Sequence, residues 1–183
     1  MHAKMNYQQI IDFWFVETDP ASWWRADPDF DRLIRETFGA VYGQASRCEL
    51  YAWRGAPLGR LAEIIVLDQF SRNMFRGRAE AFATDPLALA LAQEAVAAEA
   101  ALALTPRMQA FLYLPFMHSE SREIHEVALK LYSEKGLEAN LDFELRHKAI
   151  IDRYGRYPHR NALLGRTSSA EEREFLKTPG SSF

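Results

Sequence analysis

The sequence predicts an all-α protein in which antiparallel helix pairs form a compact α-α superhelix of about seven helices. Apolar residues recur at helical spacing, cap signals and Gly or Pro breaks separate the periodic segments, and no Asn-Gly turn joins two alternating runs. The connections are short, which favours antiparallel neighbours. The 183 residues suit one helical domain, 1–183, with loose ends at 1–5 and 178–183.

The first two helices begin at recognisable cap signals. Asn6 and Gln9 form a capping box, which predicts a helix that continues to about Glu17. Asp27 is an N-cap residue, and a proline follows it at the first helical position. This signal predicts a second helix over residues 28–47, with an apolar stripe along one face.

The segment from Leu58 to Arg76, LGRLAEIIVLDQFSRNMFR, is predicted to be the central helix of the fold. At about 100° per residue, its residues 64–67, all apolar, point in four well-separated directions. A surface helix would show one apolar stripe and one polar face. We therefore expect other helices to enclose this segment.

Proline, glycine and cap residues predict the later helices. Thr84-Asp85-Pro86 and Thr105-Pro106 each start a helix, and Pro115 inside the second predicts a kink or an early end. Further helices are expected over 120–135, capped by Ser119, over 137–154, and from a capping box of Ser168 and Glu171 to about residue 177. A repeat of tetratricopeptide length, about 34 residues, fits the spacing of helix pairs, although its consensus side chains are absent.

Composition argues against several classes of protein. The net charge of −3 shows no basic excess, so we expect no binding of nucleic acid. The single Cys48 excludes an internal disulfide and is interpreted as a small buried residue rather than a nucleophile. No charged-then-apolar leader opens the chain and no apolar run approaches membrane-spanning length, which predicts a cytoplasmic protein without a membrane anchor.

Four polar residues at the end of the central helix form the first candidate site. Asp68, Gln69, Arg72 and Asn73 cover an arc of roughly 140° on an α-helix. Asp68 and Arg72 are spaced i,i+4, as are Gln69 and Asn73, so the members of each pair can touch. A charge beside a core must be paired or must shift its pKa. The alternative is structural, because a buried Asp68–Arg72 pair would also fix neighbouring elements.

Two further polar clusters follow apolar segments. His118 and Glu120 form one, and Arg156, His159, Arg160 and Asn161 in the irregular stretch RYPHRNALLGR form the other. Basic residues without an acid between them suit an anion such as a carboxylate or phosphate. Alternatively, Arg156 or Arg160 pairs with Asp68 or caps a helix.

Most sequence motifs typical of metal, cofactor or catalytic sites are absent. His118 is a candidate general acid–base group. No metal is expected, because the chain has no HExxH motif, no Cys pair and no His pair at i,i+4. We also expect no cofactor, since there is no glycine-rich phosphate loop, and there is no GxSxG elbow either. The adjacent Trp23 and Trp24 are interpreted as core residues, or alternatively as the wall of a ligand pocket.

Several motifs resemble a known family. LDQFSRNMFRG, DPLAL, FLYLPFMHSE and RYPHRNALLGR, with DFWF and WW near the start, are similar to the bacterial domain-of-unknown-function family 924 from about Ile10 to Phe175. Ser71 stands where we associate proline with many relatives. The resemblance implies an all-helical fold similar to tetratricopeptide-repeat superhelices and brings no established activity. The residues that carry it are Asp68, Gln69, Arg72, Asn73, His118, Ser119, Glu120, Arg156, Pro158, His159, Arg160 and Asn161.

Three functional hypotheses follow. The first is binding of a small anionic ligand, or an acidic peptide end, in a pocket between helices. The second is a hydrolase or transferase with an acid–base pair drawn from His118, His159, Glu120 and Asp68. The third is a scaffold for a partner helix or peptide, with structural polar clusters. The first hypothesis uses Asp68, Gln69, Arg72, Asn73, His118, Glu120, Arg156, His159, Arg160 and Asn161 as ligand-binding residues.

Overall fold

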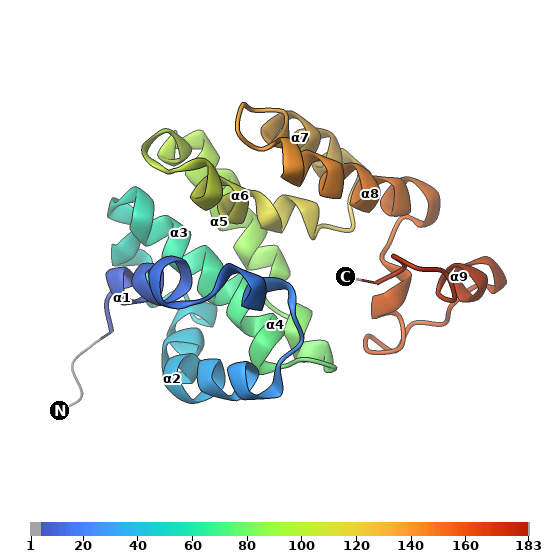
Figure 1. The fold of residues 1–183 in the computed structure, drawn as a ribbon, viewed down its shortest axis with the longest axis horizontal. Helices are drawn as coiled ribbons and strands as arrows, with labels where there is room; N and C mark the ends of the chain where they lie inside the picture. The colour runs from blue at the N-terminus through green and yellow to red at the C-terminus, as the bar shows by residue number, and fades with distance from the viewer. Residues whose placement is uncertain (1–4, 183) are drawn as a thin grey trace.

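The computed structural model describes residues 5–182, which fold into helices and their connections (Figure 1). None of these residues forms a β-strand, which confirms the all-α class. Residues 1–4 and 183 of the predicted loose ends lie outside the described range. The α-helices are α1 (Tyr7–Asp12), α2 (Pro28–Ser46), α3 (Pro57–Ile65), α4 (Ser71–Met74), α5 (Asp85–Ala97), α6 (Pro106–Met117), α7 (Arg122–Tyr132), α8 (Glu138–Tyr154) and α9 (Ala170–Phe175).

Shorter helical segments extend or connect these helices. Two of them are π-helical, η1 (Phe13–Glu17) and η4 (Val66–Phe70). The others are 3-10 turns: η2 (Pro20–Trp24), η3 (Tyr51–Gly55), η5 (Ala79–Phe82), η6 (Ala100–Ala103) and η7 (Pro158–Arg160). The N-terminal predictions are confirmed, because the capping box of Asn6 and Gln9 is present and Asp27 caps α2.

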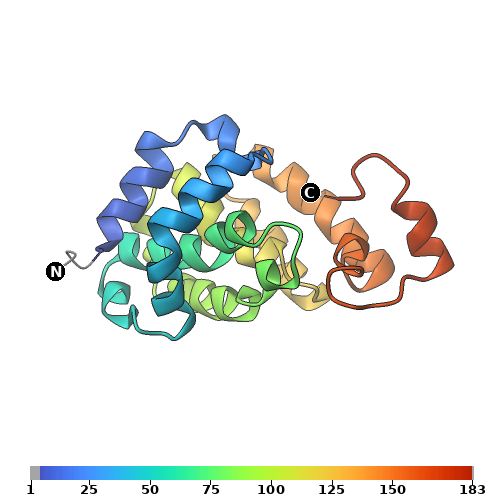
Figure 2. The ribbon, with the colours of Figure 1, turned by 90° about the horizontal axis from the view of Figure 1, so that it is seen from below.

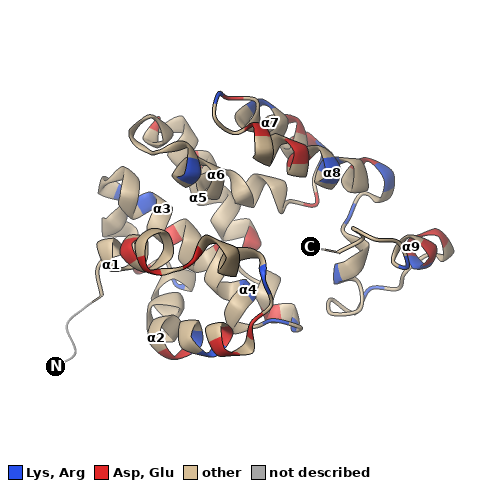
Figure 3. Ribbon diagram, viewed as in Figure 1, with Lys and Arg blue, Asp and Glu red and all other residues tan. Residues whose placement is uncertain are grey.

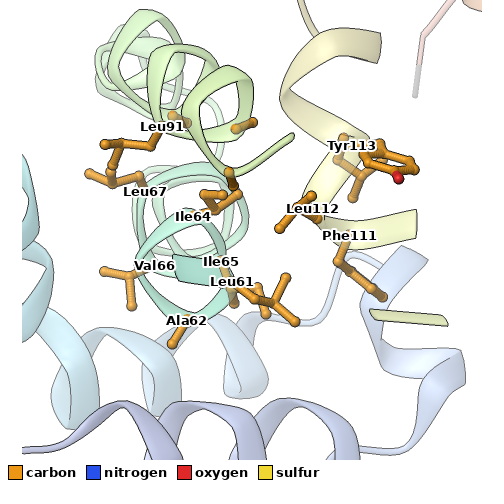
Figure 4. Packing of buried hydrophobic residues seen from close by; sticks show 14 of the residues in the cluster. Leu61, Ala62, Ile64, Ile65, Val66, Leu67, Leu91, Phe111, Leu112 and Tyr113 are labelled. Atoms are coloured by element: carbon orange, nitrogen blue, oxygen red, sulfur yellow. The ribbon is translucent and has the colours of Figure 1, made fainter. Parts of the chain in front are cut away.

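Segments α3, η4 and α4 together form the predicted central helix. α1 packs against α3, α2 packs against η4 and α4, and α5 and α6 also contact α3. Residues 64–67 are at most 1% exposed. In Figure 4 their side chains point in separate directions, with Leu91 of α5 on one side and Leu112 of α6 on another. Other helices therefore enclose this one, and the polar residues at its end are held in the interior.

The π segment η4 changes the backbone register within this helix. A π turn takes about one more residue than an α turn and shifts the hydrogen bonds to i→i+5. Side chains bind the carbonyls here: Thr84 Oγ1 donates to Leu67 O at 2.7 Å, and Arg72 Nη1 donates to Asp68 O at 2.6 Å. The residues after η4 consequently point in directions that a regular α-helix would not give them.

Helices α5, α6, α7 and α8 form a row in which each packs against the next (Figures 1 and 2). This row agrees with a stack of helix pairs, and the closer likeness to tetratricopeptide superhelices stays a prediction. Pro115 lies inside α6, which continues to Met117, so an early end at the proline is wrong. Residues 110–117 are all buried, and this packing outweighs the backbone hydrogen bond that proline removes.

Two predicted caps are displaced along the chain. Ser121 rather than Ser119 caps α7, and its Oγ accepts a hydrogen bond from Ile124 N at 3.4 Å. The box of α9 is formed by Ser169 and Glu172, one residue after the predicted pair. In each case the signal was correct and the chosen serine was wrong, because a serine nearby in the chain offers the same side chain to the backbone.

A second, smaller apolar cluster joins α8 to the C-terminal segment. Ile150, Ile151 and Tyr157 are buried there, and Tyr154 and Phe175 pack against them. Within the tail predicted to be loose, Ser181 is 6% exposed and its hydroxyl donates to Leu176 O at 3.2 Å. The C-terminal residues therefore fold back onto the end of the helical row.

Gly59 permits a close approach between η3 and the first turn of α3. A Cβ atom at this position would lie 2.0 Å from Trp53 O, which is a backbone atom and cannot swing away. We predict that Gly59→Ala lowers the free energy of unfolding by at least about 2 kcal/mol. Gly39→Ala in α2 is the control: its Cβ would meet nothing within 4 Å, and it should gain up to about 1 kcal/mol of helix propensity. Equal stabilities in urea titration would contradict this account.

His147 in α8 is a buried base. It is 6% exposed, its Nδ1 lies 2.7 Å from Phe143 O, and burial lowers its pKa to about 3. The unfolded imidazole keeps a pKa near 6.5. Between these two values, the unfolded chain binds a proton that the folded chain does not. The stability contributed is complete above about pH 6.5 and falls as the pH drops, by about 2 kcal/mol at pH 5.

Urea unfolding at pH 7 and pH 5 checks this prediction. The loss of stability between the two pH values should be smaller in His147→Gln than in the wild type. An unchanged loss would show that other groups control the acid sensitivity of the fold.

Candidate functional site

The polar end of the central helix meets α6 at a buried carboxylate. Asp68 is 1% exposed, and its Oδ1 lies 2.8 Å from His118 Nδ1. Gln69 Nε2 donates to Asp68 Oδ2 at 2.6 Å, so both carboxylate oxygens are hydrogen-bonded. Burial alone would raise the pKa of Asp68, but the nearby Arg72 and His118 outweigh it and hold that pKa well below its usual value. Asp68 is therefore an anion inside the fold.

Arg72 joins this carboxylate to α5. Its guanidinium lies 3.4 Å from Asp68 Oδ1 and donates two hydrogen bonds to Asp85, at 3.0 and 3.1 Å. The predicted Asp68–Arg72 contact is thus present, and Arg72 is shared between two acids. The site contribution of Asp85 was missed by sequence reasoning, which treated Thr84-Asp85-Pro86 only as a helix start. Asp85 begins α5, where its carboxylate binds arginines instead of the helix backbone.

Arg160 of η7 approaches the same acid from the C-terminal part of the chain. Its Nη1 donates to Asp85 Oδ2 at 3.3 Å, and its Nη2 donates to His118 O at 3.0 Å. The guanidinium carbon lies 4.7 Å from the centre of the Phe82 ring and 4.6 Å from that of Tyr157. Arg160 is 5% exposed, and its Nε is buried without a hydrogen-bond partner in the described part of the chain. Burial, with Arg72 nearby, lowers its pKa.

His118 uses one of its two ring nitrogens for a hydrogen bond within this cluster. Nδ1 bonds to Asp68, and the hydrogen bonds found among residues 5–182 include none at Nε2. Burial lowers the pKa of His118 although Asp68 opposes the change, and this favours the neutral ring. Because an ionised carboxylate accepts only from a protonated nitrogen, Nδ1 carries the hydrogen and Nε2 carries the lone pair.

Several predicted site residues lie in other networks. Asn73 Nδ2 donates to Asp31 Oδ1 on α2 at 2.8 Å, and Gln69 bonds to Asp68 instead, so the Gln69–Asn73 spacing does not become a hydrogen-bonded pair. Each of the two amides is instead hydrogen-bonded to a buried carboxylate. Arg156 Nε donates to Glu172 of α9 at 2.7 Å. Arg156 therefore holds the C-terminal segment, and its partner is Glu172 rather than Asp68 or a helix C-terminus.

Glu120 and Asn161 also bind within the C-terminal segment. Glu120 accepts two hydrogen bonds from Arg166, at 2.6 and 2.9 Å, and one from Tyr157 N at 2.8 Å. Asn161 donates to Ser168 Oγ at 3.0 Å and accepts from Arg166 Nε at 2.9 Å. Arg166, a further basic residue of the stretch RYPHRNALLGR, is thus the centre of this network.

His159 lies beside Tyr157. Its ring centre lies 5.7 Å from that of Tyr157, and burial lowers its pKa to about 4. The structure therefore brings together Asp68, Gln69, Arg72, His118 and Arg160 with the unpredicted Asp85, while Asn73, Glu120, Arg156 and Asn161 have partners elsewhere.

Two surface hollows lie away from this cluster. One of about 590 Å³ lies between α8 and the C-terminal residues, and one of about 300 Å³ lies beside Trp23 and Trp24. Trp23 Nε1 donates to Trp14 O at 3.1 Å, so Trp23 joins the core as expected, whereas Trp24 is 65% exposed. Cys48 is exposed rather than buried, because it lies in the turn after α2.

The described residues lack a grouped set of metal ligands and a membrane-spanning helix. Within residues 5–182, no three His, Cys, Asp or Glu side chains are grouped so that they could hold a metal ion. Over the same range, no helix combines the length and the apolar character that crossing a membrane requires.

Comparison with known proteins places the chain in one family. The family described as bacterial protein of unknown function (DUF924) matches residues 10–180. A solved structure of a protein of unknown function from Agrobacterium tumefaciens is similar over 93% of this chain and 96% of that chain, with 37% sequence identity and a TM-score of 0.89. A search of curated proteins found no match. The family match spans nearly the whole chain, so the protein belongs to the DUF924 family of bacterial proteins of unknown function.

Proposed function

We propose that this protein is a hydrolase or transferase in which His118 acts as a general base. The observation that carries the proposal is the 2.8 Å hydrogen bond from His118 Nδ1 to Asp68 Oδ1. This bond leaves the lone pair on Nε2 of a ring whose side chain is 12% exposed. Nε2 would take a proton from water in hydrolysis, or from an acceptor hydroxyl in group transfer, and return it to the leaving group.

The two arginines support an anionic substrate. Arg72 and Arg160 share Asp85, yet the ion-pair contact of Arg160 is long at 3.3 Å, and its Nε has no partner among the described residues. A carboxylate or phosphate of the substrate would complete the hydrogen bonding of this buried cation and reduce its repulsion from Arg72. The same positive charges would stabilise negative charge that develops in the transition state. Binding of an anion without a reaction is the simpler form of this proposal.

The remaining site residues take supporting roles in this proposal. Gln69 holds the second oxygen of Asp68, and Asp85 keeps the two arginines side by side. Glu120, Arg156 and Asn161 fasten the segment that carries Arg160. His159 receives no catalytic role, since the Asp68 carboxylate bonds to His118.

The protonation state of His118 is the first prediction from this site. We expect a neutral ring at pH 7 with its hydrogen on Nδ1, because Asp68 accepts from that nitrogen. Proton–nitrogen NMR of the ring resonances distinguishes the two neutral tautomers from the charged form. Asp68→Asn should weaken the preference for Nδ1–H. A hydrogen on Nε2, or a charged ring at pH 7, would remove the basis of the proposal.

Activity provides the second test. We expect turnover of some member of a panel of small carboxylate esters and phosphate esters. The rate should be constant at high pH and fall as the pH drops through the lowered pKa of His118, because only the neutral ring accepts a proton. His118→Gln should reduce kcat by about 10²- to 10⁴-fold. His147→Gln, which removes a histidine outside the cluster, should keep the wild-type rate, and equal rates for all three proteins would refute the role of His118.

Arg72 should also be essential to the framework. Arg72→Ala would leave the buried Asp68 and the partly buried Asp85 without their shared cation, so we expect a loss of about 3–5 kcal/mol in the free energy of unfolding. Arg78→Ala is the control, because Arg78 pairs with Glu80 at the surface and should contribute little. Urea titration measures the free energy of unfolding of both variants. A small loss in both would show that Arg72 does not stabilise the fold and serves only to bind a ligand.

A further inference from the structure

A groove runs beside α8, and the proposed chemistry does not use it. α8 is the last helix of the row that begins at α5, and the chain after it folds back towards the helix (Figures 1 and 2). The groove of about 590 Å³ lies between them. Its α8 residues include Phe143, Arg146, Ile150 and Arg153, whose spacing of three or four residues places them on one face of the helix.

The floor of this groove is apolar. Ile150 of α8 and Phe175 of α9 line it, and both belong to the small C-terminal cluster. Phe143 at one end is 54% exposed, although phenylalanine gains more than most residues from burial. The last helix of a helical stack normally shows a polar outer face to water. An apolar hollow at that position is a feature of interaction sites.

Two arginines stand along the same face of α8. Arg146 and Arg153 are seven residues apart, which corresponds to about 10.5 Å along a helix. Figure 3 shows positive charge along the second half of α8. Their side chains are 69% and 58% exposed, and their partners Asp142 and Glu171 are 62% and 61% exposed. Ion pairs this open contribute little to stability, so both arginines can exchange these acids for those of a ligand.

We propose that this groove binds an amphipathic α-helix of another protein, with apolar residues on one face and two acidic residues seven positions apart. A helix that lies along α8 would insert its apolar side chains between Ile150 and Phe175. Its two carboxylates would meet Arg146 and Arg153, whose separation matches two turns of either helix. A fatty acid would fill the apolar floor but carries one carboxylate, and would leave one arginine unused. The spacing of the arginines therefore favours the helix.

A designed peptide tests this assignment. The probe is a fluorescently labelled helix of about five turns with leucines on one face and two glutamates seven positions apart. Fluorescence anisotropy with the full chain should show saturable binding. The double variant Arg146→Glu/Arg153→Glu should weaken it at least about tenfold. A peptide with lysines in place of the two glutamates should bind that variant better than the wild type.

Matched variants separate the groove from general surface effects. Phe143→Ala should weaken binding, whereas Leu102→Ala, which removes an apolar side chain from a residue that is 80% exposed, should not. Arg32→Glu reverses an arginine that is 59% exposed on α2 and should leave the affinity unchanged. All the replaced groove side chains are more than half exposed, so these variants should keep the wild-type melting temperature.

Three results would overturn the proposal. One is the absence of saturable binding of the glutamate peptide. Another is peptide binding that Arg146→Glu/Arg153→Glu and Arg32→Glu weaken equally, which would indicate general charge attraction. The third is binding of laurate, but not of the peptide, with the same sensitivity to the groove variants, which would assign the groove to an anionic amphiphile.

Discussion

The buried charge of Asp68 is the constraint on which the rest of this structure depends. A carboxylate at 1% exposure cannot be solvated by water and must find its partners within the protein. His118 and Arg72 meet this need directly, and Arg72 brings Asp85 and, through it, Arg160. These residues come from α6, the central helix, α5 and η7. One charge thus fixes how four separate parts of the chain sit around the same point, and the framework and the proposed site are the same set of contacts.

The sequence could predict the enclosure of the central helix but not its π segment. Four successive apolar residues require neighbours on all sides, whatever the detailed backbone. The extra residue at η4 depends on partners such as Thr84 and Arg72, which bind the carbonyls of Leu67 and Asp68. These partners are brought there by the tertiary fold. Periodicity in the sequence contains no signal of them.

The cap signals differ in the same way. Some caps form at the predicted residue, and others form at a different one. Asn6 is a cap as predicted, because its side chain bonds the backbone of its own helix. Asp85 looked like a similar signal, but two arginines from distant segments bind its carboxylate. Ser168 accepts from Asn161, and Ser169 caps α9 in its place. Rules based on neighbouring residues succeed where no group distant in the sequence competes for the side chain. The site consists of residues whose side chains are bound by such distant groups.

Burial gives the arginines of this protein two different kinds of chemistry. Arg160 is 5% exposed, so any charge that reaches it acts in a medium that screens poorly, and its position is held by Phe82 and Tyr157. Such a cation keeps a fixed position and interacts strongly with a charge placed beside it. Arg146 is mostly exposed, and it can exchange its ion-pair partner with little loss of stability. A residue of the first kind suits a reaction centre, and one of the second kind suits a surface that binds and releases a partner.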